Sequence, residues 1–303
     1  MNIDLTVKIN SLVFKNPVLT ASGTSGYGIE LSRLFHISKL GGLITKSVTL
    51  KPRMGNFPPR ITETPCGMLN SIGLENKGIK YFLSEILPQI KRFKTVIIVS
   101  IAGETISEYA ELAKILDGKV DALEVNISCP NVKKGGMIFG QDSSATEKVV
   151  RAVRESTSLP IIVKLTPNVA RIEEFAKICE QNGADAVSLV NTYKGLAIDI
   201  NTRSSKLGSF TGGVSGPAIK PLALYAVWIV AKNVRIPVVG CGGIMDWKDA
   251  IEFFMAGASL IEIGSATFRD PEAALLIIKG ITSFLRKKKI ENINKIVGVT
   301  NEN

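Results

Sequence analysis

Short runs of apolar, mostly β-branched residues recur along the chain between stretches with the periodicity of amphipathic helices. Eight such runs begin at Pro17, Gly42, Val96, Ala122, Ile161, Ala186, Pro237 and Leu260. Nearly continuous apolarity is typical of parallel strands buried on both faces, and ISEYAELAKIL is one of the helical stretches between them. The alternation predicts an α/β fold, and eight strand–helix units predict a (β/α)8 TIM barrel rather than a doubly wound open sheet.

Several segments lie outside these eight units. LTVKINSLVF, before the first unit, predicts a β-hairpin that covers the bottom of the barrel. Residues 49–76 and 191–216 are long insertions rich in Gly, Pro, Ser and Asn, which predict irregular loops, and residues 130–142 form a third candidate loop. All three follow strands, so we expect them on the C-terminal face, where a barrel builds its active site. We expect a single domain over residues 1–303.

The composition excludes several classes of protein. Lys and Arg give a net charge of +10 but are spread along the chain without interleaved aromatic residues, which argues against nucleic-acid binding. No run of eighteen apolar residues appears, and the N-terminus lacks the order of a secretory signal, so we expect a cytoplasmic protein without membrane contact. The four cysteines form no C-x-x-C pair, so we expect neither a zinc site nor an iron–sulfur cluster in this chain.

The predicted strands end in an unusual number of polar or glycine residues, which makes their C-terminal ends the candidate site. In chain order these positions are Ser22, Lys46, Ser47, Ser100, Asn126, Lys164, Asn191, Thr192, Gly242, Gly243, Gly264 and Ser265.

Lys46 and Lys164 follow or lie within apolar runs, where an isolated ammonium group loses its hydration, so we expect each to meet a negative ligand. The alternative is an internal salt bridge to a strand carboxylate such as Glu124 or Glu262. The glycines after the last two strands favour a phosphate held by backbone N–H groups, with ordinary turn chemistry as the alternative.

Cys129 lies in a loop after the fourth strand, where a thiol near lysines loses its proton more easily and can act as a base or nucleophile. An inert cysteine is the alternative. The only histidine, His36, precedes the second strand and is expected to be a packing or surface residue. Catalysis by a Ser-His-Asp or Cys-His arrangement is therefore not expected.

Six motifs occur in order along nearly the whole chain: TKSVTLKPRMGNFPPRI, NSIGLEN, NISCPNVKKGG, KLTPN, GGVSGPAIKPLAL and VVGCGGI. Together they resemble the dihydroorotate dehydrogenase family. NISCPNVKKGG, with Phe139-Gly140 nearby, is similar to the bacterial and archaeal type that works with a separate electron-transfer subunit. That type uses cysteine as its catalytic base, and the resemblance places Cys129 in this role.

The resemblance implies FMN on the C-terminal face of the barrel and dihydroorotate as the substrate. It assigns contacts with FMN to Ser22, Lys46, Ser47, Ser100, Asn126, Lys164, Val190, Gly216, Gly242, Gly243, Gly264 and Ser265. It assigns contacts with the substrate to Lys46, Asn70, Ser71, Ile72, Gly73, Leu74, Asn126, Asn131, Asn191 and Thr192. Relatives commonly have Asn where this chain has Ser100, and this shorter side chain would reach the flavin through a water molecule.

In the mechanism implied by the resemblance, Cys129 removes the C5 proton while a hydride leaves C6 for the flavin. Because this chain has no nicotinamide motif and no cluster cysteines, we expect a partner that accepts the electrons. The resemblance implies that this partner is a subunit carrying FAD and [2Fe-2S], which passes electrons to NAD in a heterotetramer built on a homodimer of this chain. The alternatives are the homodimeric fumarate-reducing type, a flavin enzyme acting on uracil-type rings, and a phosphate-binding barrel without redox chemistry.

Overall fold

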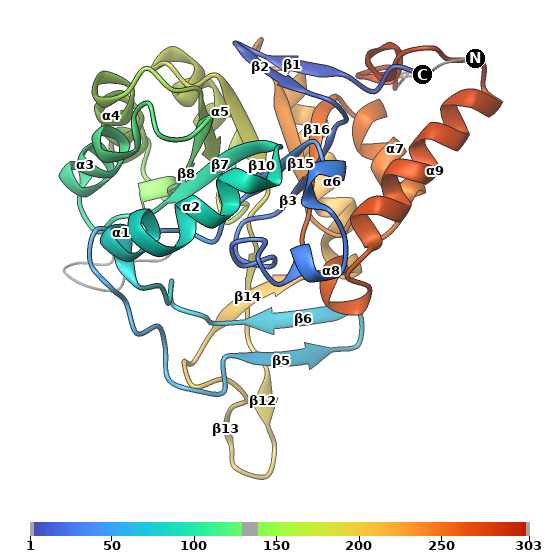
Figure 1. The fold of residues 1–303 in the computed structure, drawn as a ribbon. Helices are drawn as coiled ribbons and strands as arrows, with labels where there is room; N and C mark the ends of the chain where they lie inside the picture. The colour runs from blue at the N-terminus through green and yellow to red at the C-terminus, as the bar shows by residue number, and fades with distance from the viewer. Residues whose placement is uncertain (1–2, 129–138, 301–303) are drawn as a thin grey trace.

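A computed structural model describes residues 3–128 and 139–300. Eight parallel strands form a closed barrel, as the apolar runs predict (Figure 1). They are β3 (Val18–Thr20), β4 (Gly42–Ile44), β7 (Val96–Ile101), β8 (Ala122–Asn126), β9 (Ile161–Lys164), β10 (Ala186–Leu189), β15 (Val238–Cys241) and β16 (Ala258–Ile263). Nearly every residue of these strands is buried, because each strand has barrel core on one face and helices on the other. The prediction of a (β/α)8 barrel is confirmed.

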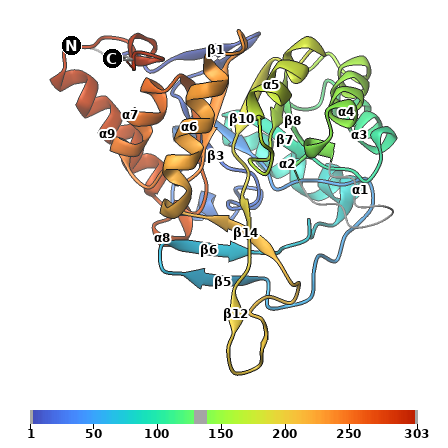
Figure 2. The same ribbon diagram turned by 180° about the vertical axis from the view of Figure 1, so that it is seen from behind.

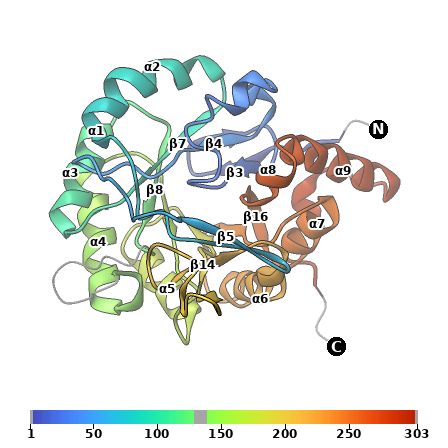
Figure 3. The same ribbon diagram turned by 90° about the horizontal axis from the view of Figure 1, so that it is seen from below.

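Helices surround the barrel and cover its outer face (Figure 3). They are α1 (Gly78–Tyr81), α2 (Leu87–Ile90), α3 (Ile106–Leu116), α4 (Ser143–Ser156), α5 (Ile172–Gln181), α6 (Lys220–Ala231), α7 (Trp247–Met255), α8 (Ala266–Arg269) and α9 (Ala273–Lys287). A π-helical segment, Phe82–Ile86, joins α1 to α2.

The sequence fixes where three of these helices begin. The side chains of Thr105, Asp142 and Asp246 accept hydrogen bonds from backbone N–H groups in the first turns of α3, α4 and α7. Such caps satisfy N–H groups that have no partner within the helix and stabilise a helix by about 1 kcal/mol each. They follow directly after the loops from the barrel's C-terminal face, so they also fix where those loops end.

The N-terminal hairpin lies at the opposite end of the barrel from the strand ends that carry the candidate site. β1 (Val7–Ile9) pairs with β2 (Leu12–Phe14), and Asn10 turns between them with a φ of 50°. The Asn10 amide donates to the Asp185 carboxylate at 2.7 Å, just before β10 begins. The predicted hairpin and its position at the bottom of the barrel are confirmed.

The two long insertions are not irregular loops, which corrects the prediction. They contribute β5 (Ile61–Thr64), β6 (Gly67–Asn70), β11 (Tyr193–Gly195) and β14 (Gly212–Ser215) to one four-stranded sheet, in the order β11-β14-β6-β5. A separate hairpin of β12 (Ile198–Asp199) and β13 (Ser204–Ser205) projects beyond it (Figures 1 and 2).

The glycines of the second insertion explain why the sequence pattern did not predict this sheet. A side chain at Gly195 would meet Val214, and one at Gly213 would meet the hydroxyl of Thr192. These strands therefore need glycine to pack closely, whereas strand propensity disfavours it. The sheet lies across the C-terminal end of the barrel, so the predicted location of both insertions is confirmed.

Three cysteines and the histidine lie within the described residues. Cys179 is buried on α5 and Cys241 is buried in β15, whereas Cys66 is exposed in the turn between β5 and β6. His36 is exposed at the start of a short 3-10 helix, Ile37–Lys39. Within residues 3–128 and 139–300, no helix is long and apolar enough to cross a membrane.

Candidate active site

The strand registers bring the predicted polar positions together at one end of the barrel. Asn126 at the end of β8 lies beside Lys164 at the end of β9, and Lys164 lies beside Ser188 of β10. On the opposite wall, Cys241 of β15 is in register with Glu262 of β16. Because neighbouring parallel strands end at nearly the same height, residues far apart in sequence face a common space.

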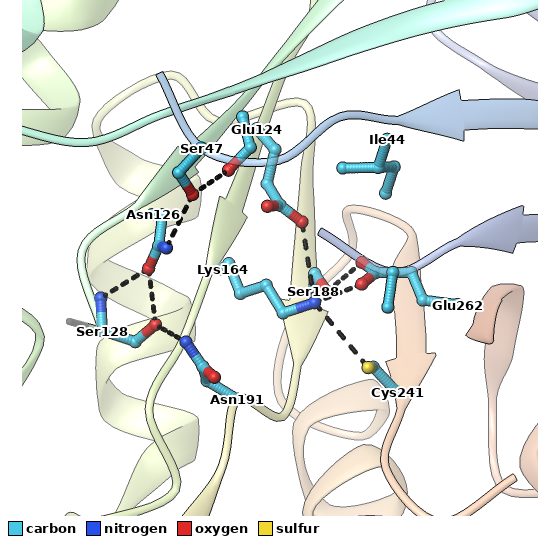
Figure 4. A network of polar contacts seen from close by, with 12 residues as sticks. Ile44, Ser47, Glu124, Asn126, Ser128, Lys164, Ser188, Asn191, Cys241 and Glu262 are labelled. Carbon is cyan, nitrogen blue, oxygen red and sulfur yellow. Dashed lines mark hydrogen bonds and ion pairs between the residues drawn. The ribbon is translucent and has the colours of Figure 1, made fainter. Parts of the chain in front are cut away.

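A chain of hydrogen bonds links five hydroxyl and amide side chains along the rim (Figure 4). The hydroxyls of Ser47 and Ser100 are 2.8 Å apart, and the Asn126 amide donates to Ser47 at 3.1 Å. The Ser128 hydroxyl donates to the Asn126 carbonyl at 2.7 Å and itself accepts a hydrogen bond from the Asn191 amide. This network fixes the two amides, which can each donate to and accept from a planar polar ligand.

Beneath this network, Lys164 extends into the barrel between two carboxyl groups (Figure 4). Its ammonium contacts Glu262, lies 3.6 Å from a Glu124 oxygen and 3.7 Å from the sulfur of Cys241. Ser188 also donates to Glu262. The internal salt bridge that the sequence offered as the alternative is therefore present at Lys164, and a negative ligand is not needed to explain its burial.

The environment of this cluster shifts the pKa values of its members. Burial lowers the pKa of Lys164, but its acidic neighbours outweigh burial and raise the pKa overall, so the ammonium is charged at neutral pH. Burial raises the pKa of Glu124 to about 7, against the opposing effect of Lys164. Burial likewise raises the pKa of the Cys241 thiol to about 12, so this thiol is neutral near pH 7.

Lys46 lies two residues beyond the end of β4 and is half-buried rather than enclosed in a strand. Its ammonium forms a salt bridge with Glu75, which belongs to the first insertion. That hydrogen bond lowers the pKa of Glu75 more than the partial burial of Glu75 raises it. The partner of Lys46 is therefore a loop carboxylate and not a strand carboxylate.

Backbone conformation by itself also favours glycine at the predicted phosphate-binding positions. Gly216, Gly242 and Gly243 have φ values of 101°, 128° and 75°, and a side chain at Gly243 would meet the backbone of Lys220. Ordinary turn chemistry thus explains part of the pattern. The N–H groups of Gly243, Gly264 and Ser265 nevertheless donate to no backbone group in the described part of the chain, and they leave adjacent strands at the same level. Free N–H groups of this kind suit a phosphate.

Known proteins resemble the chain over nearly its whole length. The sequence profile of the family "Dihydroorotate dehydrogenase" matches residues 4–285. The chain belongs to the dihydroorotate dehydrogenase family. Two relatives, from Bacteroides fragilis and Thermodesulfovibrio yellowstonii, are named "Dihydroorotate dehydrogenase B (NAD(+)), catalytic subunit". The chain is 50% and 52% identical to them over 297 and 296 residues, which is 97% of this chain and 98% of each relative.

The positions that the resemblance to the dihydroorotate dehydrogenase family assigns to the substrate lie at two levels. Asn126, Asn191 and Thr192 lie on the barrel rim, whereas Asn70 ends β6 in the sheet above it and donates to the Gly213 carbonyl at 3.3 Å. Ser71, Ile72, Gly73 and Leu74 continue the same loop, half-buried, towards Glu75. Cys129 and Asn131 lie outside the described residues.

Two of the remaining positions assigned to FMN also lie at the barrel end. Val190 is buried directly after β10, and its N–H donates to the carbonyl of Cys241 at 2.7 Å. Ser22 follows β3, which is in register with β16 at Thr20 and Ile263. This register brings Ser22 to the same end of the barrel as Ser265.

Sequence reasoning missed three residues that belong to this arrangement. Glu75 pairs with Lys46, Ser128 joins the two rim amides, and Ser188 donates to Glu262. Each had a signal in the sequence: Glu75 is part of NSIGLEN, Ser128 directly precedes Cys129, and Ser188 is the one hydroxyl in the apolar run AVSLVN. The partner of each became identifiable only in the folded chain.

Proposed function

We propose that this chain is the catalytic subunit of an NAD-linked dihydroorotate dehydrogenase, which oxidises dihydroorotate to orotate in pyrimidine biosynthesis. The observation that carries the proposal is the network of amide and hydroxyl groups on the barrel rim above a buried lysine. Dihydroorotate is a ring of alternating carbonyl and N–H groups, and fixed amides complement such a ring because each can donate and accept. The two relatives named above carry this activity in their names.

FMN is the proposed cofactor, and the described residues fit it. The free N–H groups of Gly243, Gly264 and Ser265, with the turn at Gly216, would hold its phosphate. Ser22, Ser47, Ser100, Asn126 and Val190 would contact the ring and ribityl chain, and Lys164 would stabilise negative charge at the pyrimidine edge. When bound, the flavin accepts the hydride from C6 of the substrate.

The substrate would lie between the barrel rim and the first insertion. Asn126, Asn131, Asn191 and Thr192 would bind the ring, and residues 70–74 would cover it. Lys46 would bind the substrate carboxylate, as one ammonium can hold a carboxylate through a charge-assisted hydrogen bond. In the structure the Lys46 ammonium is half-buried and paired with the carboxylate of Glu75, which supports a role in binding a carboxylate.

Cys129 is the proposed general base, which takes the proton from C5. It directly follows Ser128, whose hydroxyl joins Asn126 to Asn191 on the rim. This neighbourhood supports a position next to a ligand held by the two amides. A thiolate can serve as a base where nearby cations favour its charged form.

A partner subunit carrying FAD and [2Fe-2S] is proposed to pass the electrons to NAD, in a heterotetramer built on a homodimer of this chain in the cytoplasm. The names of the relatives support a partner, since each is called a catalytic subunit and includes NAD(+). Large apolar side chains exposed on the insertions, among them Met54, Phe57 and Ile200, support assembly with other chains. We also propose that residues 1–303 form one domain.

The test is a visible spectrum of the purified chain, followed by addition of dihydroorotate without oxygen. We expect a yellow protein that loses its colour, because oxidised flavin absorbs blue light and reduced flavin does not. A yellow protein that keeps its colour would overturn the substrate and favour an enzyme for uracil-type rings. A colourless protein that takes up no added FMN would overturn the cofactor.

A further inference from the structure

Two carboxyl groups oppose a single ammonium group in the interior of the barrel. Lys164 contacts Glu262 and lies 3.6 Å from Glu124, and the exposed fractions of the three side chains are only 4%, 0% and 0%. The proposed function uses Lys164 but gives neither carboxyl group a role. Buried charges are rarely retained without a partner, so an excess of acid here calls for an explanation.

Within residues 3–128 and 139–300, the other groups around the cluster cannot balance this excess. They are Ser22 after β3, Ser100 of β7, Ser188 of β10 and Cys241 of β15. The hydroxyls carry no charge, and the thiol is neutral near pH 7 because burial raises its pKa to about 12. The charge of the cluster is therefore set by one ammonium and two carboxyl groups.

The two carboxyl groups differ in how they are held. Glu262 accepts hydrogen bonds from both Lys164 and Ser188, so it is paired with the ammonium in a salt bridge. The hydroxyls of Ser22 and Ser100 lie near Glu124 and act to lower its pKa, but neither buried oxygen of Glu124 accepts a hydrogen bond of standard geometry from a described residue. Burial raises the pKa of Glu124 to about 7, so this group holds a proton below neutral pH and loses it above.

We propose that Glu262 is a positioning residue for the flavin: it anchors the Lys164 ammonium inside the barrel and, together with Glu124, offsets the positive charge that Lys164 presents to the pyrimidine edge. This inference rests on the proposed function, because it requires a flavin above Lys164. The Glu262 carboxylate, in its salt bridge with Lys164, then disfavours added negative charge on the flavin. Glu124 adds to this effect only when it is ionised.

The two carboxyl groups should therefore lower the reduction potential of the flavin below the value that Lys164 alone would give. Removing the charge of Glu262 should favour the reduced flavin at every pH. Replacing the carboxyl group of Glu124 should raise the flavin potential at pH values above 7, where the native group is ionised. It should change the flavin potential little at pH 6.

The experiment measures the midpoint potential of FMN bound to the full chain, by equilibration with redox dyes at pH 6 and pH 8. For Glu262→Gln we expect the preference for reduced over oxidised FMN to rise about tenfold, a positive shift of about 30 mV for a two-electron couple. Glu124→Gln should shift the potential positively at pH 8 only. The control is Glu147→Gln, which removes an exposed carboxylate on α4 and should shift nothing.

Ser188→Ala provides a milder variant if Glu262→Gln does not fold. It removes one hydrogen-bond donor from Glu262 and loosens the group that anchors Lys164, so it should shift the potential in the same direction by less than about 30 mV. A Glu262→Gln potential equal to that of the control, or shifted negatively, would overturn the inference. For Ser188→Ala the same two results would count against it.

Lys164→Met separates failure of this inference from failure of the proposed function. If Lys164 lies at the pyrimidine edge, this variant should bind FMN with a lower potential. A lowered potential in Lys164→Met, with no shift in Glu262→Gln, would reject only the role of Glu262. An unchanged potential in Lys164→Met, or a native chain that binds no FMN, would overturn the proposed position of the flavin and the inference with it.

Discussion

At the scale of single residues, Glu124 has the most unusual environment in the described chain. Its side chain is fully buried, both of its oxygens lack a hydrogen bond of standard geometry with a described residue, and the nearest cation is already bound to Glu262. An ionised carboxylate under these conditions loses more hydration than its neighbours replace. Glu124 therefore makes the free energy of unfolding of the chain depend on pH.

This link predicts a pH-dependent difference between the native chain and Glu124→Gln. The pKa of Glu124 is about 7 in the folded chain against an ordinary value of 4.5. The stabilisation from its proton is fully present below pH 4.5 and is lost as the pH rises to 7, because the unfolded chain releases this proton first. Relative to the variant, the native chain should lose on the order of 2–3 kcal/mol across this window. Urea unfolding at several pH values measures the difference, and parallel curves for the two chains would contradict it.

Cys129 gives a second prediction at this scale. Replacing Cys129 by Ala should leave FMN bound but slow flavin reduction by dihydroorotate about 10²- to 10⁴-fold, the usual contribution of a general base. Anaerobic stopped-flow absorbance measures this rate. Cys66→Ala is the matched control, because that thiol is exposed in a turn of the outer sheet, and its rate should equal the native rate. Undiminished reduction in Cys129→Ala would refute the assignment.

At the scale of elements, the turns after β15 and β16 carry the free N–H groups of the proposed phosphate site. The chain leaves β15 through Gly242 and Gly243 in conformations that side chains rarely adopt, and α6 packs directly against this turn. The same turn carries one of the free N–H groups proposed to hold a phosphate. A change in the backbone of this turn would therefore also change the proposed binding of the phosphate.

Gly243→Ala tests that coupling. The added methyl group would lie 2.8 Å from the backbone of Lys220 at a φ of 75°, so we expect a loss of about 2–3 kcal/mol in the free energy of unfolding and weaker FMN binding. The control is Gly118→Ala, which has a φ of 66° but open space around it, and which should lose about 1 kcal/mol and bind FMN normally. Urea unfolding and fluorescence titration with FMN measure both effects, and equal losses in the two variants would contradict the expectation.

At the scale of the whole molecule, the hairpin and the candidate site lie at opposite ends of the barrel. The N-terminal hairpin lies at one end, whereas the sheet from the two insertions lies across the other (Figure 1). Strands β6 and β14 come from insertions more than a hundred residues apart and pair directly, with Leu69 opposite Val214. A ligand on the barrel rim would therefore lie beneath a sheet whose strands come from both insertions (Figure 1).

The proposed partner gives the prediction at this scale. The FMN of the isolated chain should be reduced by dihydroorotate, but the reduction of NAD should be slow. The reason is that the sequence contains no nicotinamide motif and no cluster cysteines to carry electrons from FMN to NAD. Addition of the electron-transfer subunit should raise NAD reduction by orders of magnitude, measured as absorbance of NADH. Rapid turnover of the isolated chain with fumarate would contradict the proposal and identify the homodimeric fumarate-reducing type instead.

Much of the fold follows from the sequence, because the period of apolar positions reports local geometry. All eight barrel strands, the N-terminal hairpin and the positions of the buried cysteines were predictable in this way. The strands of the insertions were not, because their glycines are required by contacts with distant residues such as Val214. Local propensity carries no information about such contacts.

For the site, the sequence determined which residues stand at the strand ends and, through its motifs, the family. Only the tertiary structure decided how they combine: Lys164 takes Glu262 rather than Glu124 as its closest partner, and Lys46 takes Glu75 from a loop. The physical reason is that partner choice depends on distances of a few ångströms across a closed barrel. Strand register and burial set those distances, and neither is a property of a short segment.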